Sequence, residues 1–282
     1  MEKIQSAIEK ARIARYAIRD ASAEEAARHN GGSSMMAVAA RQEQASAAAW
    51  AALPEISVDG VRMRDRRIVA FAGGKDAVPF DMMRTKVIQQ MRLNGWHRLA
   101  ITSPAPTCGK STIALNLAMS LARNREVHTI LAEVDLRRPS LAAMLGIGNR
   151  RGFAEVLAGR AVFADAAQRF GSGLAMALSD GPVHNSAELL NGQPVAEALD
   201  AIEARYAPDI MIFDMPPMLV SDDTMVFAHH VDAVLLIAGA ESTTIKEIDS
   251  CERELATQTN VMGIVLNKCH FSNQEYDYDY YG

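Results

Sequence analysis

The sequence lacks several features that would place the chain in a specialised class of protein. It contains only three cysteines, whose spacing matches neither a disulfide framework nor a zinc site, as is typical of a reducing cytosol. No apolar run approaches the roughly 18 residues of a membrane span, and the polar start does not resemble a signal peptide. The net charge of −5 argues against general nucleic-acid binding. We therefore expect a cytoplasmic protein that binds no nucleic acid and meets the membrane only through a partner.

The amino-terminal part of the chain differs in composition from the rest. Residues 2–18 place apolar side chains near helical spacing, which predicts a short amphipathic helix. Residues 20–50 are rich in Ala, Ser and Glu and include a Gly-Gly pair, which indicates a flexible connector with fragile helical stretches. We predict a helical segment with an Ala/Ser-rich linker, a nucleotide-binding domain and a flexible tail, over residues 1–55, 56–270 and 271–282.

From about residue 97 the pattern changes to short apolar runs that alternate with helical segments. The expected strands are Arg98–Thr102, Thr129–Glu133, Ile210–Asp214, 233–238 and 261–266. Near-continuous apolar strands between helices indicate an α/β fold with a parallel sheet covered by helices on both faces. In such a sheet ligands bind at the carboxyl ends of the strands.

A phosphate-binding loop is predicted between the first of these strands and the next helix. The sequence S-P-A-P-T-C-G-K-S-T at residues 103–112 follows the pattern G-x-x-x-x-G-K-[ST], with Pro104 in the first glycine position. Lys110 is expected to reach the β- and γ-phosphates of a nucleotide, and the Ser111 hydroxyl to bind Mg²⁺. A chance match at a helix start is the alternative, which the flanking strand and apolar helix disfavour. The expected nucleotide-binding residues are Thr107, Cys108, Gly109, Lys110, Ser111, Thr112 and Asn267.

Two of the other strands end in acidic residues. Asp214 follows four apolar residues and precedes Pro-Pro, the form of a Walker B strand whose carboxylate holds Mg²⁺; a simple turn-forming aspartate is the alternative. The segment I-L-A-E-V-D-L-R-R-P resembles a Walker A′ motif, an apolar run followed by D-x-D and an arginine. Its acidic residues are Glu133 and Asp135.

The phosphate loop, the A′ motif, the Walker B strand and a terminal tyrosine cluster, in this order along the chain, resemble the bacterial tyrosine kinases of exopolysaccharide and capsule systems. The resemblance covers roughly residues 60–282. It implies a MinD/ParA-like P-loop scaffold and tyrosine phosphorylation that depends on ATP and Mg²⁺. By position it implies catalytic residues Lys110, Glu133, Asp135 and Asp214, and metal-binding residues Ser111, Asp135 and Asp214.

One position departs from the pattern of this family. The first acid of the A′ motif is normally Asp, thought to act as base toward the tyrosine hydroxyl or as a metal partner, whereas this chain has Glu133. Phosphoryl transfer depends mainly on positioning and charge. We therefore expect slowed or retuned catalysis, with Asp135 able to share the role.

The chain ends in a tyrosine-rich tail. Four of its six tyrosines lie in the last seven residues, among aspartates and without apolar periodicity, which is typical of a mobile segment. The resemblance implies autophosphorylation in trans, with docking of tails building a ring and phosphate charge breaking it. The expected acceptors are Tyr276, Tyr278, Tyr280 and Tyr281.

Several arginines are candidates for phosphate or subunit contacts. Arg137 and Arg138 follow the A′ motif and either neutralise phosphate, sit at a subunit contact, or are simply solvated. The family also carries an oligomerisation helix with the pattern E-x-x-R-x-x-R. The aligned stretch keeps Asp81 and Arg84 but has Val87 in place of the last arginine, which affects the expected ring interface.

We expect a tyrosine autokinase that controls exopolysaccharide polymerisation or export. Its partner would be a membrane polysaccharide co-polymerase whose cytoplasmic tail activates the kinase and recruits it to the inner face of the plasma membrane. One alternative is a MinD/ParA-like ATPase switch, although that family normally has a second lysine early in the loop and none lies between Ser103 and Gly109. The other is an ATP-binding regulator without kinase activity.

Overall fold

The computed structural model describes residues 32–148 and 151–269, which form parts of two compact units, residues 1–48 and 49–282. The first described element is helix α2 (Gly32–Ala51). A flexible connector with fragile helical stretches on either side of the Gly-Gly pair was predicted over residues 20–50, and the structure describes this region from Gly32 on, as a helix. The many alanines have the highest helix propensity of all residues and outweigh the serines between them. The amphipathic helix predicted over residues 2–18 lies outside the described residues.

Seven strands of the second unit form one sheet, in the order β3-β4-β2-β5-β1-β6-β7. All neighbouring strands are parallel except β3 and β4, so the predicted mostly parallel sheet is confirmed. The short pair β3–β4 was not predicted. The strands are β1 (Arg98–Thr102), β2 (Thr129–Glu133), β3 (Ala167–Phe170), β4 (Leu174–Ala177), β5 (Ile210–Asp214), β6 (Ala233–Gly239) and β7 (Asn260–Asn267).

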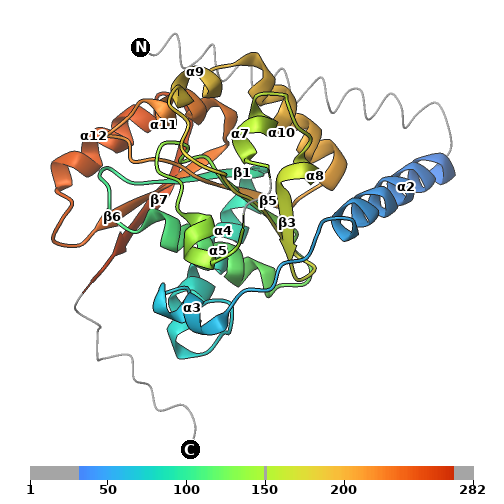
Figure 1. Ribbon diagram of the computed structural model, residues 1–282, viewed down its shortest axis with the longest axis horizontal. Helices are drawn as coiled ribbons and strands as arrows, with labels where there is room; N and C mark the ends of the chain where they lie inside the picture. Colours follow the sequence, from blue (N-terminus) through green and yellow to red (C-terminus); the bar gives the residue numbers. More distant parts are fainter. Residues whose placement is uncertain (1–31, 149–150, 270–282) are drawn as a thin grey trace, which may run out of the picture. The chain divides into compact units, whose positions relative to one another are not determined.

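Helices cover both faces of the sheet, as Figure 1 shows for α4 and α5 on one side and α10 and α11 on the other. Alternate side chains of a strand point to opposite faces, so Leu99 and Ile101 join one apolar cluster and Ala100 the other. The first face carries α3 (Gly60–Asp65), α4 (Val78–Asn94), α5 (Lys110–Ala122) and α6 (Leu141–Leu145). The second carries α7 (Phe153–Leu157), α8 (Phe163–Ala166), α9 (Ser186–Leu190), α10 (Gln193–Tyr206), α11 (Asp223–Phe227) and α12 (Ile245–Leu255).

The remaining short helices are η1 (Lys75–Ala77), before α4, and η2 (Ala228–His230), after α11. At the end of α2, the indole of Trp50 is buried and donates a 2.7 Å hydrogen bond to the Tyr206 carbonyl, which joins the start of this unit to α10. No helix in the part of the chain that the structure describes is long and apolar enough to cross a bilayer.

Candidate functional site

The pairing of the central strands brings the predicted motifs together at one edge of the sheet. Asp214 at the end of β5 is the register partner of Glu133 on β2 and of Ile101 on β1. The phosphate loop begins directly after Thr102, the last residue of β1, and leads into α5. Three segments that lie far apart in the sequence therefore meet at the carboxyl ends of adjacent strands, where ligands of parallel sheets bind.

The loop has the backbone conformation of a phosphate cradle. Thr107 and Gly109 have positive φ angles of 67° and 94°, and Gly109 immediately precedes the first residue of α5. A Cβ atom on Gly109 would collide with the side-chain amide of Asn267. That amide donates a 2.8 Å hydrogen bond to the Cys108 carbonyl, so the end of β7 lies against the loop.

The loop is also fastened to the segment that follows β5. The carbonyls of Ser103 and Pro104 accept hydrogen bonds of 2.9 and 3.0 Å from the backbone amides of Met218 and Leu219. The Thr102 hydroxyl donates a 2.7 Å bond to the carbonyl of Pro216. These bonds hold the loop against the Walker B segment.

Lys110 lies between two of the predicted acidic residues. Its Nζ donates a 2.7 Å hydrogen bond to Oδ2 of Asp135, lies 3.6 Å from Oδ1 of Asp214, and lies 3.3 Å from the Ser111 Oγ. Burial lowers the pKa of Lys110, but the charges of Asp214 and Asp135 outweigh burial and leave this pKa raised. The lysine is therefore a fixed cation at the point where a nucleotide phosphate would arrive.

Asp214 has the properties of a metal-binding carboxylate. It is fully buried, and neither carboxylate oxygen has a hydrogen-bond partner. Burial raises the pKa of Asp214, and the charge of Lys110 acts in the opposite direction. A buried carboxylate that accepts no hydrogen bond, and whose ion pair with Lys110 spans 3.6 Å, is costly unless a further cation completes its environment. Asp214, Asp135 and the Ser111 hydroxyl thus fit Mg²⁺, an ion that prefers oxygen ligands.

The described residues contain no cluster of three His, Cys, Asp or Glu side chains that would hold a metal by itself. This agrees with the usual way in which nucleotide enzymes bind Mg²⁺, with one or two carboxylates and the phosphates of the substrate. Ser111 and Thr112 are half-buried in the first turn of α5. Cys108 is buried, with its Sγ 3.5 Å from the Thr243 Oγ1.

Glu133 is placed differently from the other acidic residues. Its Oε1 accepts hydrogen bonds of 2.6 and 2.8 Å from the amides of Ser140 and Leu141, and Oε2 accepts one of 2.9 Å from the amide of Ser179. The side chain is fully buried. Burial raises the pKa of Glu133, while the three amides act in the opposite direction. Both oxygens thus face backbone donors, which does not favour the expected role of base.

The two arginines after the A′ motif have different environments. Arg137 forms a bidentate pair with Asp223, with bonds of 3.1 and 2.9 Å to Oδ1 of that fully buried carboxylate. The Ser186 hydroxyl donates a 2.6 Å bond to Oδ2 of Asp223. Among the described residues, the exposed side chain of Arg138 has no hydrogen bond or ion pair. Arg137 therefore joins the A′ loop to α11, and Arg138 is available to other groups.

The aligned oligomerisation helix is α4, and its polar residues bind within the chain. The Arg84 guanidinium lies 3.2 Å from Oδ1 of Asp81 and donates a 3.0 Å bond to the Ser120 carbonyl on α5. Asp81 also pairs with Arg123 at 2.7 Å. Val87, where the family has its last arginine, is buried in the apolar cluster.

Two features of the site region could not be read from a motif. Asn116 on α5 is fully buried, and its Oδ1 accepts bonds of 2.8 and 3.0 Å from the amides of Val69 and Ala70, which holds the preceding segment against α5. Asp223 is the first residue of α11, and its buried carboxylate pairs with Arg137. The tyrosines at 276, 278, 280 and 281 lie outside the described residues.

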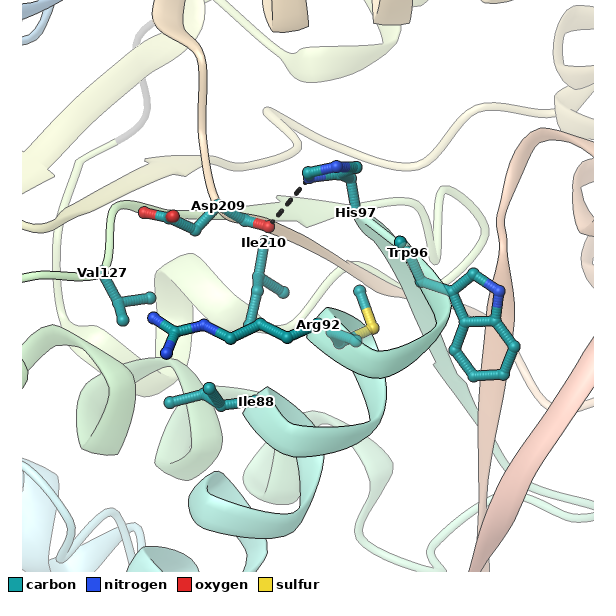
Figure 2. Close-up of a pocket in the computed structure, with 9 residues that line it drawn as sticks. Ile88, Arg92, Trp96, His97, Val127, Asp209 and Ile210 are labelled. Carbon is teal, nitrogen blue, oxygen red and sulfur yellow. Dashed lines mark hydrogen bonds between the residues drawn. The ribbon is translucent and has the colours of Figure 1, made fainter. Parts of the chain in front are cut away.

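A separate cavity lies away from the phosphate loop, at the amino-terminal ends of the strands. Figure 2 shows Arg92 and Ile88 of α4 on one side of it, and His97, before β1, whose ring bonds the Asp209 carbonyl at 3.2 Å. The cavity of about 260 Å³ is lined mainly by apolar side chains and lies at the amino-terminal ends of β1 and β5. None of the expected site residues lines it.

A parallel sheet, a phosphate loop between its first strand and α5, and acidic ends on two adjacent strands define a P-loop NTPase. The family model for ParA, described as an NUBPL iron-transfer P-loop NTPase, matches residues 96–281. The cell-division ATPase MinD of Pyrococcus furiosus has the same fold, with a TM-score of 0.53 and 20% identity over 63% of this chain and 74% of that structure.

The relatives with higher sequence identity include several kinases. Tyrosine-protein kinase YwqD of Bacillus subtilis is 32% identical over 64% of this chain and 76% of its own length. The solved VpsO kinase domain has a TM-score of 0.60 and 30% identity, covering 68% of this chain and 94% of that structure. The kinase domain of Escherichia coli tyrosine kinase ETK has a TM-score of 0.62 and 26% identity, over 70% of this chain and 78% of that structure.

The chain therefore belongs to the ParA-like P-loop NTPases and, within them, to the bacterial tyrosine kinases. The family predicted from the motifs is confirmed. The chain spans about a quarter of the length of several curated relatives, for example 28% of tyrosine-protein kinase etk of Escherichia coli K12 and 26% of EpsB of Ralstonia solanacearum.

Proposed function

We propose that the chain is an ATP-dependent protein-tyrosine autokinase that transfers the γ-phosphate of ATP to its own carboxyl-terminal tyrosines. The observation that carries this proposal is the convergence of Lys110, Asp135 and Asp214 within 3.6 Å at the phosphate loop. It occurs in a chain of the tyrosine kinase family whose sequence ends in four tyrosines.

The residues of the loop would bind the triphosphate. Backbone amides between Thr107 and Ser111 and the start of α5 would face the phosphates, because helix N-termini and loops with positive φ angles bind anions. Lys110 would leave Asp135 and contact the β- and γ-phosphates. Asp135, Asp214 and Ser111 would hold Mg²⁺, which would neutralise the charge that develops on the transferred phosphoryl group.

The transfer itself would join a tyrosine hydroxyl oxygen to the γ-phosphorus. The bond between that phosphorus and the β,γ-bridging oxygen breaks, ADP leaves, and the hydroxyl proton passes to a carboxylate or to solvent. Lys110 stabilises the departing ADP oxygen by its positive charge. Of the residues expected to be catalytic, Lys110, Asp135 and Asp214 would act at this centre.

We further propose that phosphorylation occurs in trans within a homo-oligomeric ring, and that phosphate charge disassembles the ring. Each phosphate adds almost two negative charges, so several on one short tail would repel a neighbouring tail strongly. An activating partner would be the cytoplasmic tail of a membrane polysaccharide co-polymerase, which would link the kinase to exopolysaccharide polymerisation or export. The candidates for phosphate or subunit contacts are Arg84, Arg137 and Arg138. Arg84 and Arg137 already bind groups within the chain, whereas among the described residues the side chain of Arg138 binds none.

Incubation of the purified protein with Mg-ATP, followed by mass spectrometry for phosphotyrosine, tests the proposal. We expect phosphate on Tyr276, Tyr278, Tyr280 or Tyr281, no signal in Lys110→Met, and little signal after removal of residues 276–281. ATP hydrolysis without phosphotyrosine, even with the partner's tail present, would favour the MinD/ParA-like switch. That second function is supported by the match to the ParA family model. Binding of ATP without either activity would identify a regulator.

A further inference from the structure

Glu133 occupies the position at which the family normally has a shorter acid, and its longer side chain reaches beyond the nucleotide site. It bonds the amides of Ser140 and Leu141, which follow the A′ loop, and the amide of Ser179, which follows β4. One fully buried carboxylate thus connects the end of β2 to two other segments of the fold. The described contacts leave neither oxygen facing the Lys110 amine.

The segment that Glu133 fixes is also bonded to the metal-binding part of the site. Residues 136–140 run from Asp135 to the start of α6, and Glu133 holds their far end through Ser140. At the near end, the amide of Arg138 donates a 3.1 Å bond to Oδ1 of Asp135. The other oxygen of Asp135 accepts the 2.7 Å bond from Lys110. Hydrogen bonds at the two ends of this segment and the backbone from Arg138 to Ser140 therefore link Glu133 to the lysine of the phosphate loop.

We propose that Glu133 is a positioning residue, which fixes the 136–140 segment and through it the orientation of Asp135, and that it does not receive the tyrosine proton. This inference rests on the proposed kinase function and assigns a role within the same site. The three amide bonds engage both carboxylate oxygens, and turning either oxygen toward a substrate would leave a buried amide without a partner.

The length of the side chain gives the proposal its sharpest test. Glu133→Gln keeps the length and one oxygen, which can still accept the bonds from Ser140 and Leu141. Glu133→Asp keeps the charge but withdraws the carboxylate by one methylene, about 1.5 Å, so it cannot reach Ser179 and the α6 amides together. A positioning role predicts that Gln is the better substitute, whereas a proton acceptor requires that Asp is the better one.

We would measure phosphotyrosine formation, Mg-ATP affinity and amide hydrogen exchange in Glu133→Gln, Glu133→Asp and Glu133→Ala. Glu155→Gln is the matched control, because that half-buried glutamate pairs with Arg160 away from the phosphate loop. We expect Gln to retain activity within about tenfold of wild type, because it keeps the two bonds that hold the 136–140 segment and loses only the one from Ser179. Asp and Ala should be slower, bind Mg-ATP more weakly, and exchange the amides of Ser140, Leu141 and Ser179 faster.

Activity that survives in Asp but falls by about 100-fold or more in Gln would overturn the proposal, because such an order identifies a proton acceptor. Unchanged exchange of the three amides in Ala would also overturn it. If Asp or Ala does not fold, the near-isosteric Gln variant still decides between the roles. If the wild type forms no phosphotyrosine, the proposed function fails, whereas amide exchange and Mg-ATP affinity still test the positioning role.

Discussion

The amine of Lys110 lies 2.7 Å from Oδ2 of Asp135, so the lysine of the phosphate loop is paired with an acid of the A′ strand. The pair is almost fully buried, with side chains exposed by 11% and 7%. A nucleotide phosphate would have to replace this carboxylate as the partner of Lys110, and the carboxylate would then be free to bind Mg²⁺. The same contact therefore links phosphate binding to metal binding.

The first expected outcome concerns Asp135→Asn. This change removes a negative charge next to the arriving phosphates and weakens the hold on Lys110, while it also removes a ligand for Mg²⁺. We expect metal-free ATP to bind as well as or better than in wild type, and phosphotransfer to fall by about 100-fold or more. Titration with a fluorescent ATP analogue, with and without Mg²⁺, measures both effects.

Asp200→Asn is the control for this change, because Asp200 is exposed and pairs with Arg98 away from the phosphate loop. It should leave nucleotide binding unchanged. An Asp135→Asn protein with the wild-type dependence on Mg²⁺ would show that Asp135 is not a metal ligand.

A second outcome concerns the two arginines that follow the A′ motif. Arg137→Ala leaves the buried Asp223 without its bidentate partner, which should lower the free energy of unfolding by about 1–3 kcal/mol. Arg138→Ala removes the adjacent exposed side chain, and should change the same quantity by less than about 0.5 kcal/mol. Urea denaturation followed by circular dichroism compares the two, and equal losses would contradict the assigned environments.

A third outcome separates backbone strain from collision in the phosphate loop. Gly109 and Gly95 are both left-handed, with φ angles of 94° and 64°, but of the two only Gly109 has a neighbour that a Cβ atom would meet, the Asn267 amide. Both alanine variants should lose about 1 kcal/mol of stability from the left-handed conformation. Gly109→Ala should in addition lose ATP binding, measured by calorimetry. Normal ATP affinity in Gly109→Ala would argue against the proposed phosphate cradle.

A fourth outcome is a pH dependence of stability that arises far from the phosphate loop. The pKa of His230 is lowered from 6.5 to about 4, first by burial and then by the positive charges of His229 and Arg98. The folded chain therefore favours the neutral ring, and the unfolded chain takes up the proton first as the pH falls. The contribution of the neutral His230 to the free energy of unfolding is fully present above pH 6.5 and is lost as the pH falls toward 4. We expect a loss of about 1–2 kcal/mol, because solvent partly screens the half-buried ring.

Urea denaturation at several pH values between 4 and 7 measures this decline. Replacement of His230 by Gln removes the titrating group, so it should reduce the slope over that interval. An unchanged slope in the variant would assign the effect to other residues.

The central strands and the phosphate loop could be predicted because each carries a local signal. An apolar run that ends in an acid, such as Ile210–Asp214, contains both the strand and its functional end. The strands β3 and β4 gave no such signal, because they are only four residues long and one pairs antiparallel at the sheet edge. The helix α2 was predicted only as a fragile stretch, because the Gly-Gly pair at its start was given more weight than the alanines that follow.

The hydrogen-bond partners of the site residues could not be predicted from the sequence. Glu133 owes its placement to the amide of Ser179, 46 residues further along the chain, and Arg137 to Asp223, 86 residues away. Such partners depend on how loops from different strands meet, and no spacing in the sequence records that. The motif thus indicated which side chains gather at the site, but not which of them face one another.

The most direct test of the kinase assignment mixes two variants that are each unable to label themselves. One protein lacks residues 276–281 and keeps the phosphate loop, and the other has Lys110→Met and keeps the tyrosines. With Mg-ATP, the account predicts phosphotyrosine on the Lys110→Met chain in the mixture and none on either protein alone. The absence of phosphotyrosine in the mixture, with wild-type protein labelled in parallel, would contradict transfer between chains; its absence from the wild type as well would contradict the kinase itself.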